Sequence, residues 1–380
     1  MKIGLFTPRI ISLKLGAAKN RIELAEALTQ YGWEAHLMGR VEIGLAENNS
    51  DIRAYQEAFK DYLIKNADFY DVVLYEYDTL PYDRSLFSKK TLFIARPALL
   101  HYNYETIKIK YDSKTLIKHF LKKLISLDFN PVSKEQRLSN EYGEVSLRNA
   151  DVIQVQSVRD KELLITKGYS KNKILIVPNG ISDERYKLFD EVTFDNRGDD
   201  LTIAFIGTFD FRKGAMDFKF IIDYIKKEFP KAKFVLLGTK GLFSTVDDVL
   251  RFFPKRYWND ISVYPRFEPL ELPKYLSGCH IGIFPSYFES FGFGALEMMA
   301  AGLPVVSYAV SGPSDYAIPE LLVPIGNKHS LAKKVIDLFK DKQKLALLSE
   351  ESKIISKKFN WNDIAKKASE DYKSIIKART

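Results

Sequence analysis

The chain has 380 residues, of which 46% are hydrophobic and 28% are charged. This is longer than a chain that usually forms a single hydrophobic core, so two domains are predicted. The composition is typical of a globular protein. No apolar run is long enough for a membrane-spanning helix, and the first residues have the pattern of a strand instead of a secretory signal. The single cysteine, Cys279, excludes an internal disulfide and predicts a reducing, cytoplasmic location.

The net charge of +8 predicts an anionic partner, and nucleotide diphosphates, acidic lipids or nucleic acid would fit. No nucleic-acid-binding signature is present, so no nucleic-acid partner is predicted. No two His or Cys residues have metal-ligand spacing, and no Asp-x-Asp motif occurs. The sequence therefore predicts neither a metal site nor a cofactor.

Short apolar segments alternate with helical patterns in the first part of the chain. Strands are predicted at residues 3–6, 34–38, 72–75, 92–94, 152–155 and 174–177. A helix is predicted over residues 20–30. This alternation predicts a parallel sheet covered by helices on both faces. The polar run 190–200 is the predicted linker.

The same pattern restarts after the linker. Strands are predicted at residues 201–206, 234–237, 261–264, 281–284 and 305–308. Helices are predicted at residues 215–229, 270–276, 295–301, 330–341, 343–359 and 361–377. The chain is therefore expected to form two doubly wound α/β domains, with ligands beyond the carboxyl ends of the strands and a cleft between the domains as the default site.

The stretch 285–304 carries the strongest chemical signal. It passes from a predicted strand through a loop with Glu289 and enters a predicted helix that carries Glu297. A helix N-terminus suits a phosphate, whereas carboxylates suit sugar or ribose hydroxyls. The stretch predicts a nucleotide-sugar pocket. There are two alternatives. Glu289 could be a helix cap and Glu297 a surface residue, or the two could form a general acid/base pair.

A second signal is the loop 207–214, between a predicted strand and a predicted helix. It holds the adjacent cations Arg212 and Lys213, and Gly214 allows close approach of the backbone. Two cations at a strand end are the expected chemistry for a diphosphate. A solvated turn is the alternative interpretation.

Three further features are weaker candidates. Gly16 lies between the first strand and a helix, where a phosphate or an acceptor can approach the backbone, although a plain loop fits as well. His101 follows the fourth strand, and a packed core histidine is its alternative. Residues 113–127 form a basic amphipathic pattern that suits an anionic membrane surface or packing on its own domain.

Together these motifs resemble the retaining glycosyltransferases of family 4, which have the two-domain GT-B fold. The resemblance extends over almost the whole chain, and its segments are 149–157, 176–181, 205–207, 212–214, 285–304, 311–315 and 359–361. It implies two Rossmann-like domains facing across a cleft: an acceptor-binding domain over residues 1–195 and a donor-binding domain over residues 196–360. The final helix, 361–380, is expected to pack back onto the first domain.

The resemblance also implies roles for single residues. Lys213 and Arg212 would hold the diphosphate, Glu297 the ribose and Glu289 the donor sugar. The implied donor-binding residues are Gly16, Gly207, Thr208, Arg212, Lys213, Glu289, Ser290, Phe291, Gly292, Phe293, Gly294 and Glu297. The implied catalytic residues are Glu289, Lys213, Arg212 and His101.

The sequence departs from the family pattern in three places. Gly16 is followed by alanine where many relatives have a second glycine. Thr208 stands where many have a cation. Many have a histidine directly after the fourth strand, where Arg96 and Pro97 stand here, and His101 comes a few residues later.

The predicted function is that of a retaining hexosyl- or N-acetylhexosaminyltransferase. It would move a sugar from a UDP- or GDP-sugar to a hydroxyl of a glycan, lipid-linked or protein-linked acceptor. The alternatives are a non-catalytic GT-B partner subunit that binds the donor without turnover, and a nucleotide-sugar epimerase of similar fold. Peripheral attachment to the inner face of the membrane is left open.

Overall fold

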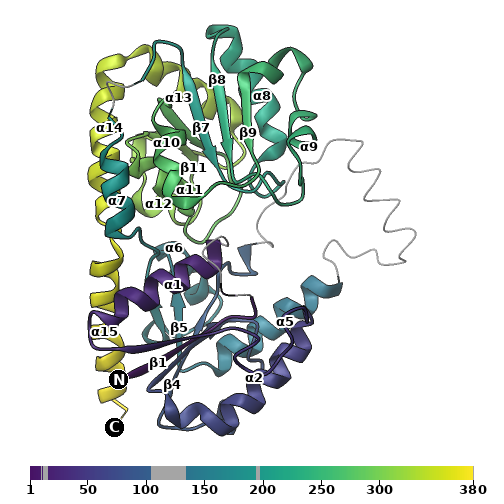
Figure 1. Ribbon diagram of the computed structural model, residues 1–380, viewed down its shortest axis with the longest axis vertical. Helices are drawn as coiled ribbons and strands as arrows, with labels where there is room; N and C mark the ends of the chain where they lie inside the picture. Colours follow the sequence, from purple (N-terminus) through teal and green to yellow (C-terminus); the bar gives the residue numbers. More distant parts are fainter. Residues whose placement is uncertain (10, 12–15, 104–133, 194–196, 380) are drawn as a thin grey trace. The chain divides into compact units, whose positions relative to one another are not determined.

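The computed structural model describes residues 1–9, 11, 16–103, 134–193 and 197–379, and it divides into two units. Unit 1 comprises residues 1–156, 160–178 and 361–380, and unit 2 comprises residues 157–159 and 179–360. Each unit contains a six-stranded parallel sheet with helices on its faces (Figure 1). The predicted α/β class with two doubly wound sheets is therefore confirmed.

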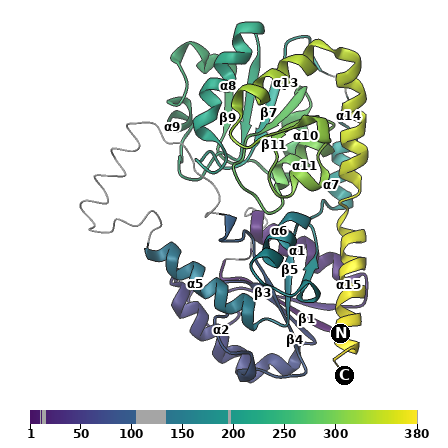
Figure 2. The same ribbon diagram turned by 180° about the vertical axis from the view of Figure 1, so that it is seen from behind.

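The sheet of unit 1 has the strand order β2-β1-β3-β4-β5-β6. Its strands are β1 Lys2–Phe6, β2 Glu34–Met38, β3 Val72–Glu76, β4 Leu92–Arg96, β5 Val152–Val155 and β6 Ile174–Ile176. The helices are α1 Gly16–Thr29, α2 Ile52–Asn66, α5 Lys134–Asn149, α6 Val158–Thr166 and α15 Trp361–Lys377. Helices α1 and α15 cover one face of the sheet and α2 and α5 the other (Figures 1 and 2). All six strands match the predicted segments to within two residues.

The sheet of unit 2 has the order β12-β11-β10-β7-β8-β9. Its strands are β7 Thr202–Ile206, β8 Lys233–Leu237, β9 Ile261–Tyr264, β10 Ile281–Phe284, β11 Val305–Tyr308 and β12 Leu322–Val323. The helices are α7 Asp183–Asp190, α8 Ala215–Glu228, α9 Val246–Leu250, α10 Leu272–Leu276, α11 Phe293–Ala300, α12 Pro313–Tyr316, α13 Lys328–Lys340 and α14 Lys342–Lys357. One hydrophobic cluster packs α8 and α13 on the sheet, and another packs α7, α10 and α11.

The boundary between the units differs from the predicted linker at residues 190–200. The chain passes from unit 1 to unit 2 after Pro178. The reason is helix α7, whose Tyr186 and Phe189 are buried in the core of unit 2. The polar run that suggested a linker follows this helix and does not separate the two cores.

Helix α15 is part of unit 1, although the whole of unit 2 precedes it in the chain. Trp361 Nε1 donates to Glu23 Oε2 at 2.8 Å, and Trp33 Nε1 donates to Ser369 Oγ at 2.8 Å. Tyr372 is fully buried, donates to Gln154 Oε1 and meets the Trp33 ring edge to face. These bonds, with buried aromatic surface, hold α15 on the sheet.

Tyr372→Ala is expected to lower the free energy of unfolding of unit 1 by about 3–5 kcal/mol, because it leaves a cavity and an unpaired Gln154 oxygen. Glu370→Ala, on the exposed face of the same helix, is the matched control and should change it by less than about 0.5 kcal/mol. Denaturant unfolding followed by circular dichroism measures both. Equal effects of the two variants would show that α15 does not stabilise the unit.

Candidate active site

The candidate site lies where the strand order of unit 2 reverses. Strands β7 and β10 are neighbours in the sheet, but the chain continues from β7 toward one edge and from β10 toward the other. The loops that leave their carboxyl ends therefore diverge, and doubly wound sheets bind ligands at such a switch point. One of these loops is 207–214 and the other is 285–292, so the two strongest sequence signals meet here.

The loop after β7 is held in shape by its own polar groups. Gly207 and Gly214 have φ angles of +154° and +83°, which favour glycine. Asp210 accepts from Thr208 Oγ1 at 2.7 Å and from the backbone N–H of Lys213 at 2.9 Å. Asp210 therefore fixes the turn that presents the Lys213 side chain. Asp210 was not among the predicted site residues, because one aspartate in a loop has no distinguishing pattern.

The two cations of this loop meet the carboxylate of the other loop. Arg212 Nη1 donates to Glu289 Oε1 at 3.1 Å, and Lys213 Nζ donates to the same oxygen. The side chains of Lys213 and Glu289 are 12% and 9% exposed, so the pair is largely shielded from water. The predicted neighbourhood of Arg212, Lys213 and Glu289 is present in the structure.

The charges of this cluster set the protonation of Glu289. Burial acts to raise the pKa of Glu289, but the positive charges of Lys213 and Arg212 outweigh it and hold the pKa below its ordinary value. Glu289 is thus a carboxylate at neutral pH, which accepts hydrogen bonds and does not donate them. Burial also lowers the pKa of Lys213, and the charge of Glu289 opposes that shift.

Helix α11 begins directly after the loop that carries Glu289. Its first residues follow Gly292, which has a left-handed backbone (φ +75°) and provides no side-chain cap. The carbonyl groups of Phe291 and Gly292 accept from the buried Tyr316 hydroxyl at 3.0 and 2.7 Å, which holds the loop in place. The buried Ser290 hydroxyl has no hydrogen-bond partner in the described part of the chain. The loop therefore presents uncapped N–H groups and a free hydroxyl, which suit an anionic ligand.

Gly294→Ala is expected to distort this loop. A methyl group at Gly294 would lie 2.4 Å from the Ile206 carbonyl oxygen, which is backbone and cannot move aside. The expected cost is about 1–3 kcal/mol in the free energy of unfolding. The control is Gly278→Ala, because a methyl group there meets nothing within 4 Å. Thermal unfolding of both variants tests this, and an unchanged midpoint for Gly294→Ala would contradict the close packing of α11 on the end of β7.

Glu297 has a partner that the sequence did not reveal. Its Oε1 accepts from Nη2 of Arg185 on helix α7, and the two side chains are only 6% and 3% exposed. The Arg185 guanidinium also lies 5.6 Å from the ring centre of Phe293. The surface position that the capping alternative required for Glu297 is excluded, because the side chain is buried.

Residues 189–355 match the model of a family described as glycosyl transferases group 1. This part of the chain is a glycosyltransferase group 1 domain. It contains both loops of the candidate site and the whole sheet of unit 2.

Curated relatives match about half of the chain. An uncharacterized glycosyltransferase of Methanocaldococcus jannaschii is 29% identical over 195 residues, which are 50% of this chain and 51% of that protein. An uncharacterized 41.2 kDa protein in the cps region of Klebsiella pneumoniae is 27% identical over 46% of this chain and 46% of its own length. The chain thus spans about half the length of the curated relatives it matches.

Solved structures resemble the whole chain. Sucrose-phosphate synthase from Thermosynechococcus elongatus has a TM-score of 0.72 at 19% identity and covers 99% of both chains. Anabaena HepE in complex with UDP and glucose has a TM-score of 0.65 at 16% identity, over 98% of this chain and 100% of its own. At these identities the likeness establishes the fold. The glycosyltransferase group 1 domain is thus the second half of a GT-B fold.

The other predicted site residues lie in unit 1. Helix α1 begins at Gly16. His101 is buried after β4, where it stacks on Tyr77 with ring centres 6.1 Å apart and lies 3.7 Å from a Glu144 oxygen. These contacts fit the packed-core interpretation of His101 as well as the catalytic one. The basic pattern 113–127 lies outside the described residues.

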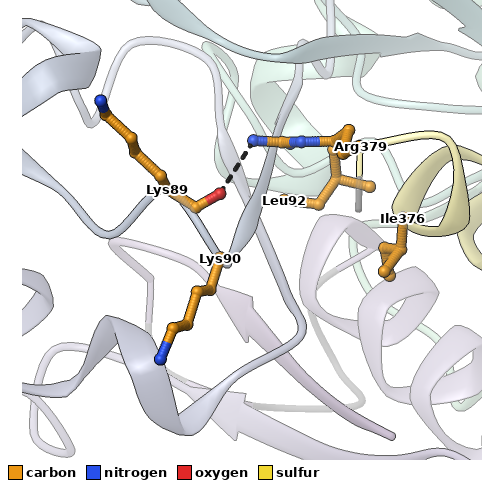
Figure 3. A pocket seen from close by; sticks show the side chains of 5 residues that line it. All are labelled: Lys89, Lys90, Leu92, Ile376 and Arg379. Atoms are coloured by element: carbon orange, nitrogen blue, oxygen red, sulfur yellow. Dashed lines mark hydrogen bonds between the residues drawn. The ribbon is translucent and has the colours of Figure 1, made fainter.

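A small hollow on unit 1 is lined by three basic side chains (Figure 3). It lies near Leu92, the first residue of β4, and so at the opposite end of that strand from its carboxyl end. Its lining residues are Lys89, Lys90, Leu92, Ile376 and Arg379. Arg379 donates to the Lys89 carbonyl at 3.3 Å and forms an ion pair with Asp151 at 2.8 Å. The hollow measures about 190 Å³, below the range of about 300–1,000 Å³ that is usual for ligand pockets.

Within the described residues, no helix is long and apolar enough to cross a membrane. The same residues bring no three His, Cys, Asp or Glu side chains together as metal ligands.

Proposed function

We propose that the protein is a retaining glycosyltransferase that moves a sugar from a nucleotide-diphosphate donor to a hydroxyl group of an acceptor. The observation that carries the proposal is Glu289, which is held between Arg212 and Lys213 in front of the uncapped N-terminus of α11. Cations, helix N–H groups and an ionised carboxylate at one switch point are the groups that a diphosphate joined to a sugar requires.

The donor would replace contacts that the cluster now makes with itself. The Glu289 carboxylate occupies Arg212 and Lys213, as an anionic ligand would. A diphosphate would take over these cations and the N–H groups of α11. Glu289 would then accept hydrogen bonds from the sugar hydroxyls. Glu297 would accept from the ribose hydroxyls while its Oε1 stays bound to Arg185.

Preorganised electrostatics would provide most of the catalysis. The reaction breaks the bond between the anomeric carbon and the diphosphate, and negative charge builds up on the leaving oxygen. Lys213, Arg212 and the N-terminus of α11 would stabilise that charge. A departing phosphate oxygen would take the proton of the acceptor hydroxyl, so retention needs no protein nucleophile. Glu289 is assigned to hydroxyl binding because its lowered pKa makes it a poor general acid.

UDP is the favoured nucleotide, because HepE is described in complex with UDP and glucose. The proposal includes a hexosyl or N-acetylhexosaminyl group as the transferred sugar and a glycan, lipid-linked or protein-linked acceptor. No metal or other cofactor is required by the proposed steps. A cytoplasmic location with peripheral attachment to the inner face of the membrane remains part of the proposal.

The test is a thermal-shift panel of UDP, GDP and ADP and their sugar derivatives with the full chain. A ligand at 100 times its Kd stabilises the folded protein by about 2.7 kcal/mol, which the panel detects readily. Donor turnover with release of nucleotide diphosphate only when an acceptor is added supports transfer. Binding without turnover would instead indicate a partner subunit, and acceptor-independent conversion of the donor sugar an epimerase. No stabilisation by any nucleotide would overturn the donor site.

A further inference from the structure

Asp217 is a buried carboxylate that the proposed transfer reaction does not use. It lies in the first turn of α8, the helix that follows the loop after β7. Tyr287 Oη donates to Asp217 Oδ2 at 2.9 Å, and Tyr308 Oη donates to the same oxygen at 2.7 Å. Lys328 Nζ lies 3.6 Å from the other carboxylate oxygen. The carboxylate therefore has the partners that a buried charge needs within unit 2.

The two tyrosines reach Asp217 from different places. Tyr308 is the last residue of strand β11, whereas Tyr287 belongs to the loop 285–292, which also carries Glu289. Burial, and after it the charge of Asp217, raises the pKa of both tyrosines. Both hydroxyl groups therefore stay protonated at neutral pH and donate to the carboxylate. Only the bond from Tyr287 connects Asp217 to a loop of the candidate site.

Tyr287 is held by its side chain and by its backbone. Its hydroxyl is bound to Asp217, and its backbone N–H donates to the Arg212 carbonyl at 2.8 Å. This one residue thus joins the loop after β10 both to the loop after β7 and to helix α8. Two residues after Tyr287, the Glu289 carboxylate accepts from Arg212 and Lys213. The position of Tyr287 therefore bears directly on how these charges meet.

The backbones of the two loops are also in close contact. Gly214 ends the loop after β7, and a methyl group there would lie 2.3 Å from the Pro285 carbonyl oxygen. The Tyr287 ring meets the buried Tyr308 ring edge to face, with ring centres 5.7 Å apart. Close-packed groups do not shift independently of one another. A displacement of Tyr287 would therefore be transmitted to both loops.

We propose that Asp217 is a positioning residue for sugar transfer: acting through Tyr287, it fixes the loop after β10 on the loop after β7. It thereby sets the distance between the cations for the diphosphate and the carboxylate for the sugar. The inference rests on the proposed function, which supplies the diphosphate and the sugar. A misplacement of about 1 Å in an active site can lower the rate about 100-fold. The alternative is a purely structural Asp217 that stabilises the first turn of α8.

The experiment compares Tyr287→Phe with Tyr308→Phe. Each substitution removes one hydroxyl group from the same Asp217 oxygen and keeps the ring, so both should lower the midpoint of thermal unfolding. Tyr287→Phe is expected to lower kcat for sugar transfer about 10- to 100-fold. Tyr308→Phe should keep kcat within about threefold of the wild type. Equal losses of kcat in the two variants, or a loss below about threefold in Tyr287→Phe, overturn the proposal.

Hydrogen exchange examines the loops without relying on transfer. In Tyr287→Phe the backbone amides of residues 285–292 are expected to exchange several-fold faster than in the wild type, because local opening becomes easier. In Tyr308→Phe they should exchange at the wild-type rate. Mass spectrometry of peptides from the full chain measures both. Unchanged exchange in Tyr287→Phe overturns the proposal. Faster exchange in that variant, with a wild type that transfers no sugar, contradicts the proposed function and supports the fixing of the loops.

A double variant tests whether Asp217 acts through Tyr287. Asp217→Ala removes the acceptor and should lower kcat about as much as Tyr287→Phe does. In a protein that already carries Tyr287→Phe, it should lower kcat by less than about twofold further, because the bond it removes is absent. If Asp217→Ala fails to fold, Asp217→Asn takes its place, since it keeps the shape and weakens the acceptor. Additive losses of kcat, or an unchanged kcat in the single Asp217 variant, overturn the assignment.

Discussion

Lys213→Ala is expected to lower kcat for sugar transfer by about 100- to 1000-fold, the loss that follows removal of one preorganised charge-stabilising donor. Lys213 is the more buried of the two cations, with a side chain 12% exposed against 27% for Arg212. Its charge acts in the less hydrated surroundings and should stabilise the leaving diphosphate more strongly. Arg212→Ala is therefore expected to have a smaller effect in the same assay.

The fold should survive this substitution, because Glu289 keeps Arg212 at 3.1 Å as its partner. Lys219→Ala is the control, since it removes an exposed cation from helix α8, which follows the same loop. The KM for the acceptor should stay within about twofold, because Lys213 acts on the leaving group and not on the acceptor. Steady-state kinetics with the donor identified by the nucleotide panel provide the measurement. A loss of kcat below about tenfold would show that Lys213 does not act at the diphosphate.

The site residues that the sequence revealed lie directly after strands. Apolar runs such as 281–284 fixed the strand ends, and in a parallel sheet the strand ends fix which loops meet. Lys213 and Glu289 could be expected together because they follow β7 and β10, although 76 residues separate them. Strand β12, which has only two residues, was missed because so short a segment has no periodicity.

Residues that reach a site from helices escaped the sequence analysis. Arg185 meets Glu297 from α7, a helix of eight residues that was not predicted. A charged residue in a short helix gives no sign that its side chain is buried. The buried ion pair of Arg21 and Glu76 was missed for the same reason, because only packing shows that these two separate ionic residues lie together. The domain boundary was misplaced because a polar run can follow a packed helix.

The second large effect is expected for Glu297. Glu297→Ala should weaken UDP binding by about tenfold or more, because the ribose hydroxyls lose a charged acceptor. The same change removes the partner of Arg185, whose side chain is 3% exposed. A buried charge without a partner typically costs about 3–5 kcal/mol of stability. Loss of UDP binding in Glu297→Ala alone could therefore reflect a damaged unit 2 instead of a missing ribose contact.

A double variant separates the two causes. Arg185→Met alone removes the salt bridge to the buried Glu297 carboxylate and should also lower the free energy of unfolding. Arg185→Met combined with Glu297→Met removes both charges and fills similar volume, and such replacements are often neutral or stabilising. The double variant is expected to regain most of the stability lost by either single variant, while UDP binding stays about tenfold or more below the wild type. Denaturant unfolding and UDP calorimetry on the same four proteins provide the comparison. Restored UDP affinity in the double variant would mean that the buried pair of Arg185 and Glu297 is only structural.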